Sequence, residues 1–458
     1  MKKIGKYIVC GMLGKGGMST VYKARLPVVD RIVALKLLSP HPNLVSLLGM
    51  GAIRSRFISE AFNIASLRSP YVVQVLDFDF HGETPFFTME YYYQDLGRLI
   101  GETYRPDQPS RILSLDRTIG YLRRLLAGLA RLHRAGIVHR DIKPGNLMIA
   151  DEDRIKICDF GLSKVRGERF DPPSQLVVGS PFYASPEQER DPDRVDPRAD
   201  LYSVGVIAHR MLTGLLPEEG IRKAGDYSPD ADADWDRFIE KALQPDPRQR
   251  FSTAPEMLSA LEDLNLAWKK KKEAFCRQVP GEVPGHGNET GTRQILRSAP
   301  AKVGTALAPD FFSCDNLLRP LRYSENRMVA SLEGKAVLDP ATGLCWQASG
   351  SEDPLGWEDA HKYVESLNQA GFGACSRWRL PTVDELLSIL RRPGLGIYDC
   401  IAPLFDKTKK VLWSRDRCTF ISAWHINVEI GCASFADFTC HFFARAVTEA
   451  VNIKEHAL

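Results

Sequence analysis

The sequence predicts a multidomain chain of the α+β class, with two folded domains separated by a linker. Residues 1–264 alternate strand-like and helix-like hydrophobic patterns, which is typical of a mixed domain. Residues 265–325 carry a run of lysines followed by closely spaced prolines and glycines, a composition typical of linkers. Residues 326–458 hold five of the seven tryptophans, which indicates a second packed core. A chain of 458 residues is long enough for two or three domains.

Charge and hydropathy argue against several classes of protein. The 60 Lys and Arg residues against 57 Asp and Glu give a formal net charge of +3, which disfavours a dedicated nucleic-acid binder. No uncharged apolar run approaches the ~18–20 residues of a membrane span, and the start of the chain lacks the apolar segment of a signal peptide. The ten cysteines form no C-x-x-C pair, so a zinc site has little support. We therefore expect a cytoplasmic protein with no membrane span and no nucleic-acid partner.

A glycine-rich loop follows the first expected strand, Tyr7 to Met12. Glycines in such a loop let the backbone approach phosphate groups closely and present N–H donors to them. Considered alone, the loop is explained equally well by a generic hairpin turn. Its residues are Leu13, Gly14, Lys15, Gly16, Gly17, Met18 and Ser19.

A lysine at the end of the strand-like segment Val33 to Lys36 strengthens the case for phosphate binding. A lysine that faces inward from a strand is costly unless anions neutralise it. ATP phosphates and one carboxylate would be suitable anions. Between Asp30 and Asp77 the only acidic residue is Glu60, which lies in a segment with helical spacing. The sequence therefore predicts a Lys36–Glu60 pair; the alternative is that both residues lie on the surface.

Two further motifs supply the groups that phosphoryl transfer needs. The first is H-R-D-I-K-P-G-N at residues 139–146, and the second is D-F-G, which begins at Asp159 after an expected strand. Asp141 can accept a hydroxyl proton and Lys143 can steady the transferring phosphoryl group. Asn146 and Asp159 can hold Mg²⁺, because oxygen ligands suit this hard cation. Residues of this set promote phosphoryl transfer by positioning the reacting groups and by neutralising the negative charge of the phosphates.

Together these motifs resemble those of the bacterial eukaryotic-like (Hanks-type) serine/threonine protein kinases. The ordered set runs G-x-G, V-A-L-K, E, H-R-D-I-K-P-x-N, D-F-G and S-P-E, and it covers most of residues 7–264. The resemblance implies a bilobal protein-kinase fold, with an N-lobe over about residues 7–92 and a C-lobe over about 93–264. It also implies ATP and Mg²⁺ as cofactors and transfer of the ATP γ-phosphate to a Ser or Thr hydroxyl of a protein.

The same resemblance implies roles for individual residues. Lys36, Glu60, Asp141 and Lys143 are expected to be catalytic. Met89 is expected to be the gatekeeper, with hinge contacts from Glu90 and Tyr92. The expected ATP-binding set comprises the seven residues of the glycine loop together with Val21, Ala34, Lys36, Met89, Glu90, Tyr92, Asn146 and Asp159.

Other expectations concern the scaffold and its regulation. Glu187 should pair with Arg250, and Asp200 should brace the catalytic loop. Residues 39–52 lengthen the gap between Lys36 and its helix, which makes the start of that helix uncertain.

The resemblance also implies a phosphate-binding role for Arg140, which precedes the catalytic Asp141. In this family such an arginine commonly binds a phosphate on the activation segment. The phosphosite candidates here are Ser174 and Ser180; Ser174 could also be an ordinary polar loop residue.

The C-terminal third shows a fold signal but little chemistry. Strands are expected over residues 337–347, 411–414, 423–428 and 442–447, and Thr382 with Glu385 forms a capping box before a helix. The motif order T-G-L-x-W, W-x-D-A, W-R-L-P-T-x-x-E-L and R-A-V over about residues 334–448 resembles the Lcl C-terminal-domain-like family. The resemblance implies a C-type-lectin-like fold related to formylglycine-generating enzymes. The tryptophans could line a carbohydrate pocket, but core packing explains them better.

The sequence favours an active serine/threonine protein kinase joined to a C-terminal recognition or sensor domain. The alternative is a partner-binding scaffold in which the C-terminal domain has the main role and kinase turnover is incidental. The protein substrate, the protein or small ligand of the C-terminal domain, the activating signal and the oligomeric state are not identified by the sequence.

Overall fold

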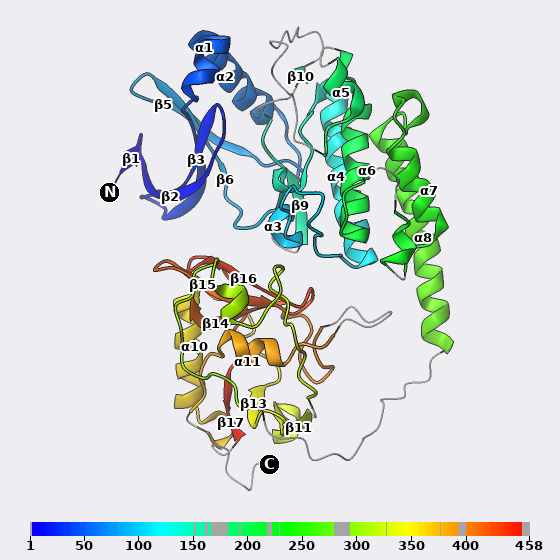
Figure 1. Ribbon diagram of the computed structural model, residues 1–458. Coiled ribbons are helices and arrows are strands. Elements are labelled where there is room, and N and C mark those ends of the chain that lie inside the picture. The colour runs from blue at the N-terminus through cyan, green and yellow to red at the C-terminus, as the bar shows by residue number, and fades with distance from the viewer. Residues whose placement is uncertain are drawn as a thin grey trace. The chain divides into compact units, whose positions relative to one another are not determined.

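The chain folds into two compact units, Met1–Pro280 and Gly281–Leu458, in the computed structural model shown in Figure 1. Each unit is described below by itself. The structure describes residues 2–150, 153–160, 164–165, 182–191, 194–217, 222–228, 230–278, 294–326, 328–375, 377–392 and 400–450. Among these residues, no helix is both long enough and apolar enough to cross a membrane.

The first unit begins with a six-stranded antiparallel sheet in the order β1-β2-β3-β4-β6-β5. Alternation along β4 sends Val33 and Leu35 into a core with Phe86, while Lys36 and Leu38 lie on the opposite face. This alternation places an apolar core behind the lysine. The strands are β1 (Lys3–Ile4), β2 (Tyr7–Lys15), β3 (Ser19–Leu26), β4 (Arg31–Leu38), β5 (Val75–His81) and β6 (Thr84–Glu90).

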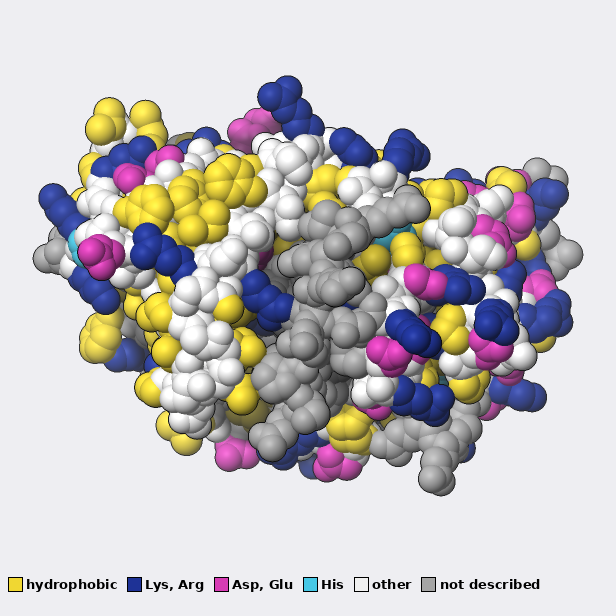
Figure 2. Space-filling model, turned by 90° about the horizontal axis from the view of Figure 1, so that it is seen from above, with side chains coloured by type: hydrophobic (Ala, Val, Ile, Leu, Met, Phe, Trp, Pro, Cys, Tyr) yellow, Lys and Arg dark blue, Asp and Glu magenta, His cyan; other side chains and the backbone are white. Residues whose placement is uncertain are grey.

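Two consecutive helices, α1 (Pro42–Leu48) and α2 (Met50–Ser66), follow β4. Helix α2 buries Ile53 and Phe57 against Leu38 and Phe87 of the sheet. The extra residues before the expected helix therefore form a helix of their own, and Gly49, with a φ of 77°, separates the two. In Figure 2, apolar side chains gather over the part of this unit that carries α1 and α2.

The remainder of the first unit is mainly helical (Figure 1). Helix α4 is amphipathic, and its leucine face is buried against α6, α8 and β9. A short hairpin, β8 (Leu147–Ala150) with β9 (Arg154–Ile157), leads directly to Asp159, and β7 (Ile137–Val138) pairs with β10 (Lys164–Val165). The helices are α3 (Leu96–Ile100), α4 (Leu115–Arg134), α5 (Pro186–Arg190), α6 (Arg198–Thr213), α7 (Ala233–Ala242) and α8 (Ala254–Gln278).

The expected linker, residues 265–325, differs from the structure at both ends. Helix α8 continues to Gln278, and Trp268 anchors it by donating from Nε1 to Asp116 Oδ1 over 2.9 Å. At the other end, Val303 and Phe312 are buried in the core of the second unit. Composition therefore predicted the wrong linker boundaries. Two kinds of folded segment have linker-like sequences: a helix that exposes a run of lysines, and an irregular segment that packs on a core.

The second unit combines two small antiparallel sheets with two principal helices. One sheet has the order β11-β12-β13-β17 and the other β14-β15-β16. Expected segments 337–347, 411–414 and 423–428 all contain strands, whereas 442–447 forms isolated bridges to Leu355 and Leu412 before β17 begins at Val447. The elements are β11 (Val329–Ser331), β12 (Ala336–Asp339), β13 (Leu344–Gln347), β14 (Val411–Arg417), β15 (Ser422–Asn427), β16 (Cys432–Asp437), β17 (Val447–Glu449), α9 (Ala308–Phe311), α10 (Trp357–Gln369) and α11 (Val383–Ser388).

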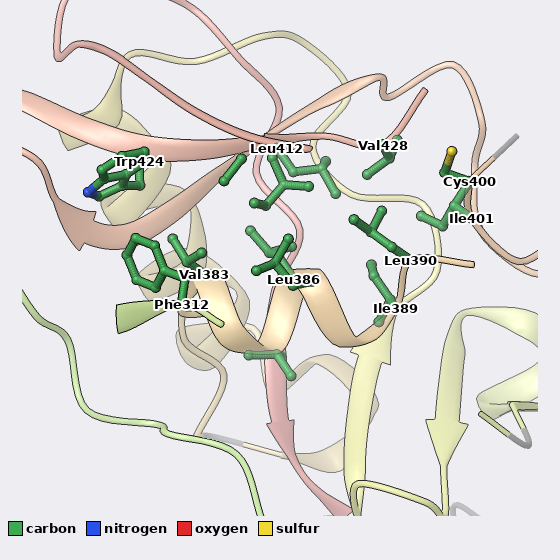
Figure 3. Close-up of a cluster of buried hydrophobic side chains, with 14 of the residues drawn as sticks. Phe312, Val383, Leu386, Ile389, Leu390, Cys400, Ile401, Leu412, Trp424 and Val428 are labelled. Atoms are coloured by element: carbon green, nitrogen blue, oxygen red, sulfur yellow. The ribbon is translucent and has the colours of Figure 1, made fainter. Parts of the chain in front are cut away.

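The core of the second unit lies between α11 and the β14–β16 sheet, as Figure 3 shows. Leu386 and Val383 of the helix face Leu412 and Trp424 of the sheet. The capping box expected at Thr382 is present, with both of its reciprocal hydrogen bonds to Glu385. Three of the five tryptophans, Trp346, Trp413 and Trp424, are fully buried, which agrees with core packing.

Candidate active site

Lys36 lies at the centre of a group of charges contributed by three elements of the first unit. Its Nζ is 2.6 Å from Glu60 Oε1 on α2 and 2.8 Å from Asp159 Oδ1 after β9. The Lys36 and Glu60 side chains are 7% and 3% exposed, whereas that of Asp159 is 48% exposed. The structure thus brings together the predicted lysine and glutamate, and adds an aspartate that remains open to solvent.

The charges in this group stabilise one another. Burial acts to lower the pKa of Lys36, but the negative charges of Asp159 and Glu60 outweigh it and raise that pKa above its ordinary value. The Lys36 ammonium holds the pKa of the Asp159 carboxyl well below its usual range. Burial raises the pKa of Glu60, and the nearby ammonium opposes that shift. The ammonium and the Asp159 carboxylate therefore remain charged at neutral pH.

Asp141, Lys143 and Asn146 form a second group, on the loop between β7 and β8. Lys143 Nζ donates to Asp141 Oδ2 over 2.8 Å, and Asn146 Nδ2 donates to the same oxygen over 2.9 Å. Asn146 Nδ2 also contacts the Asp141 backbone carbonyl over 2.8 Å. Two donors therefore fix the orientation of the Asp141 carboxylate.

Asp200 of α6 holds the loop that carries Asp141 through two backbone amides, as expected. Asp200 Oδ2 accepts from the His139 amide over 3.0 Å, and Oδ1 accepts from the Arg140 amide over 2.8 Å. Arg140 and Asp159 both adopt left-handed backbone conformations, with φ of 68° and 61°. Non-glycine residues in that region carry strain of about 1–3 kcal/mol each, which persists only where the surroundings over-determine the conformation.

A cleft of ≈ 270 Å³ is lined by Lys36, Glu60 and Asp159 of the first group and by Asn146 of the second. It opens between the sheet and the β8–β9 hairpin. The predicted residues that line it are Leu13, Gly14, Val21, Ala34, Lys36, Glu60, Met89, Glu90, Tyr92, Asn146 and Asp159. Sequence reasoning missed further lining residues, among them Val73, Tyr91, Tyr93, Asp95, Arg98, Met148 and Cys158. Apolar spacing alone gives no sign that Val73 and Met148 face a cleft and not a core.

The rest of the glycine loop does not line the cleft. The Gly16 amide donates to the Ser19 carbonyl over 2.8 Å and closes the β2–β3 hairpin. Met18 packs instead against the core beneath α2, and Lys15, Gly16, Gly17 and Ser19 are not among the lining residues. Their predicted contact with ATP stays a prediction.

Steric crowding does not explain the glycines of this loop. None of Gly14, Gly16 and Gly17 has a positive φ, and a Cβ added at Gly14 or Gly17 would meet no atom within 4 Å. Neither a positive φ nor crowding therefore requires glycine at these positions. Two other physical reasons remain: the register shift between Met12 and Gly14 in the β2–β3 pairing, and close approach of a bound molecule to the backbone.

The structure also pairs Glu187 with Arg250. The guanidinium donates from Nη1 and Nη2 to the two carboxylate oxygens, each over 2.7 Å, so the contact is bidentate. The phosphosite candidates Ser174 and Ser180 lie outside the described residues.

Comparison with known proteins agrees with this geometry. Residues 7–262 match the protein kinase domain family, and residues 335–448 match the Lcl C-terminal domain family. Serine/threonine-protein kinase pkn3 of Myxococcus xanthus is 31% identical over 344 residues, which cover 64% of this chain and 60% of the relative. Serine/threonine-protein kinase PknL of Mycobacterium tuberculosis is 33% identical over 271 residues, which cover 56% of this chain and 65% of the relative.

The chain therefore spans less than two thirds of the length of either relative. A third, the probable serine/threonine-protein kinase SCO3848 of Streptomyces coelicolor, is 34% identical over 278 residues, 56% of this chain and 40% of the relative. The match over residues 7–262 includes more than half of the chain and all of the residues that surround the cleft. The chain belongs to the protein kinase family.

Proposed function

We propose that this protein is a serine/threonine protein kinase that transfers the γ-phosphate of ATP to a protein hydroxyl. One observation carries the proposal: Lys36 contacts both Glu60 and Asp159 at the cleft, while Lys143 and Asn146 orient Asp141 beside it. The three relatives above are all named serine/threonine-protein kinases or probable ones, which supports the same conclusion.

Each charged residue has a distinct task in this mechanism. Asp141, fixed by two donors, accepts the proton of the substrate hydroxyl as that oxygen attacks the γ-phosphorus. Lys143 stands beside it and donates to the transferring phosphoryl oxygens, so that charge is neutralised where it develops. Lys36, held by Glu60, contacts the non-transferring phosphates and keeps ATP in register.

The cleft also suits Mg²⁺, the cation that the family implies. Asn146 and Asp159 supply oxygen donors, and the Asp159 carboxylate is anionic and half exposed toward the cleft. We propose that these two residues hold the ion. When bound, Mg²⁺ neutralises negative charge on the ATP phosphates.

The scaffold alternative is less favoured, because the residues required for phosphoryl transfer are present and oriented. We propose that the C-terminal domain selects the protein substrate or senses a ligand. We further propose a cytoplasmic location, with Ser174, alone or together with Ser180, phosphorylated in the active enzyme.

The direct test is phosphate transfer from Mg·ATP to a generic basic protein by the purified full chain. We expect phosphoserine or phosphothreonine in the substrate with the wild-type chain and none with Asp141→Asn. Equal incorporation by both proteins would refute the role of Asp141. No incorporation by a folded wild-type chain that binds ATP would favour the scaffold alternative.

A further inference from the structure

A buried ion pair lies close to the loop between β7 and β8 that carries Asp141, which is called the catalytic loop below. The pair belongs to none of the motifs above. Glu102, which follows α3, accepts from Arg210 Nε over 2.9 Å and from Nη2 over 3.0 Å. The Glu102 and Arg210 side chains are 1% and 0% exposed. Desolvating two charges is expensive, so such a pair is weak evidence for stability and better evidence for a fixed geometry.

Glu102 uses its remaining acceptor capacity on two tyrosines. Its Oε1 accepts from the Tyr104 backbone amide over 2.7 Å, and its Oε2 accepts from the Tyr183 hydroxyl over 2.6 Å. The two tyrosine rings meet edge to face, with centroids 5.9 Å apart. Ser203 of α6 donates to the Tyr183 carbonyl over 2.8 Å and holds that residue from the other side.

Tyr104 is held in an unusual backbone conformation by these contacts. Its φ is 55°, in the left-handed region that residues other than glycine, Asn and Asp seldom adopt. The Glu102 carboxylate on its amide and the Tyr183 ring against its own ring fix this conformation. As a result the Tyr104 hydroxyl reaches the catalytic loop, where it accepts from the Gly145 amide over 3.2 Å.

Gly145 lies between Lys143 and Asn146, and its identity fits this contact. A Cβ added at Gly145 would meet the Tyr104 hydroxyl oxygen at 2.8 Å, closer than real Cβ contacts allow. The φ of Gly145 is not positive, so the backbone itself does not require glycine. The tyrosine hydroxyl thus occupies the space that a side chain at position 145 would need.

We propose that Tyr104 is a positioning residue for phosphoryl transfer. It fixes the catalytic loop at Gly145 and joins that loop to Tyr183. The inference rests on the proposed kinase function. Tyr104 itself does not line the nucleotide cleft, although Gly145 and Asn146 do, so we expect its main effect to be on the chemical step, through the loop that carries Asp141 and Lys143. Glu102 accepts hydrogen bonds from both tyrosines, and it therefore couples the position of Tyr183 to that of the catalytic loop.

The first test is Tyr104→Phe in the full chain, which removes the hydroxyl and keeps the ring. A hydrogen bond of this kind contributes about 0.5–1.5 kcal/mol, so we expect kcat to fall about 2- to 13-fold. The KM for ATP and the KM for a peptide substrate should change by a smaller factor than kcat. The slow transfer of phosphate to water should fall by the same factor as transfer to peptide, because both use the catalytic loop.

Tyr121→Phe is the matched control. The Tyr121 hydroxyl is bonded to Arg117 Nε over 2.8 Å and to Asp153, and it does not contact the catalytic loop. This variant should lose thermal stability without losing kcat at a temperature where it is folded. If both variants lost kcat equally, Tyr104 would have only a structural role and the proposal would be wrong.

Gly145→Ala gives a second, independent test through its interaction with Tyr104. The added Cβ should clash with the hydroxyl in the wild-type background and have room once the hydroxyl is gone. We therefore expect Gly145→Ala to lower kcat by a larger factor in the wild type than in Tyr104→Phe. Equal factors in the two backgrounds would show that the contact does not position the loop.

These outcomes separate the inference from the proposed function. A wild-type chain that phosphorylates protein, with Tyr104→Phe at wild-type kcat, would overturn the inference alone. An increase in peptide KM with kcat unchanged would also overturn it, because it would place Tyr104 in substrate binding. A wild-type chain without phosphoryl transfer would instead overturn the proposed function.

Discussion

Replacing Glu60 by Gln perturbs the site at its most buried charge. The change removes one of the two carboxylates that contact Lys36, at 2.6 Å, and leaves Asp159 at 2.8 Å. Removing one partner of a buried ion pair usually costs about 3–5 kcal/mol of stability. Because Asp159 still neutralises the ammonium, we expect the loss in unfolding free energy to fall below that range.

The same change should also slow catalysis. Glutamine keeps an oxygen that can accept from Lys36 but loses the negative charge. A hydrogen bond to a charged group contributes about 1.5–3 kcal/mol, so weakening the hold of α2 on Lys36 should lower kcat by up to about 150-fold. The KM for ATP should change much less, because the cleft walls and the ammonium remain. The assay is steady-state phosphorylation of a peptide at saturating Mg·ATP, with unfolding followed in parallel by circular dichroism.

Glu256→Gln is the control for this experiment, since Glu256 forms an exposed pair with Lys241 over 2.9 Å. An exposed pair contributes at most about 1 kcal/mol, so this variant should keep wild-type kcat and nearly wild-type stability. The reasoning would be refuted if Glu60→Gln kept full kcat, or if its KM for ATP rose in proportion to the loss in kcat/KM. Either result would show that Glu60 does not orient Lys36 for the chemical step.

Three further predictions follow from the structure. Residues 1–280 alone should fold and phosphorylate a generic basic protein. Residues 1–264 should melt at a lower temperature, because they lack Trp268 of α8. Equal melting temperatures would show that the end of α8 does not stabilise the first unit. Burial lowers the pKa of His425 to about 3, whereas a histidine of the unfolded chain has a pKa of ~6.5. The neutral imidazole therefore favours the folded state fully above pH ~6.5, and this stabilisation is lost as pH falls toward 3. His425→Phe should therefore flatten the dependence of unfolding free energy on pH between about pH 6 and 4, and an unchanged slope would assign that dependence to other groups. Thr382→Ala should destabilise the second unit by about 1–2 kcal/mol in urea unfolding, because it removes the cap of α11, and Thr382→Ser should restore most of the loss.

Much of the site could be predicted from the sequence because its chemistry restricts the residue types. The Lys36–Glu60 pair followed by elimination, since no other carboxylate lies between Asp30 and Asp77. The capping box at Thr382 is a local pattern with a fixed spacing and was predicted for the same reason. Where few residue types can perform a task, the sequence names the residue.

Features that depend on tertiary contact were not predicted. The loop that carries Tyr104 has no apolar periodicity, and its contact with Gly145 joins positions 41 residues apart. Met18 lies in a phosphate-loop motif yet packs against the core beneath α2, because the loop is tied to the chain just after β4, where the Ser39 amide donates to the Met18 carbonyl over 3.0 Å. The end of α8 was missed because a run of lysines follows an anchoring residue, Trp268, and disguises the end of the helix as a linker.

The central claim is that the residues around the cleft perform phosphoryl transfer and do not merely bind nucleotide. The most direct measurement combines single-turnover phosphate transfer with calorimetric titration of Mg·ATP, on the same preparations of wild-type chain and Asp141→Asn. Asp141 contacts Lys143 and Asn146 but does not line the nucleotide cleft. We predict that Asp141→Asn binds Mg·ATP with wild-type affinity and transfers no measurable phosphate in the time of a wild-type turnover. Transfer at the wild-type rate by Asp141→Asn would contradict the account.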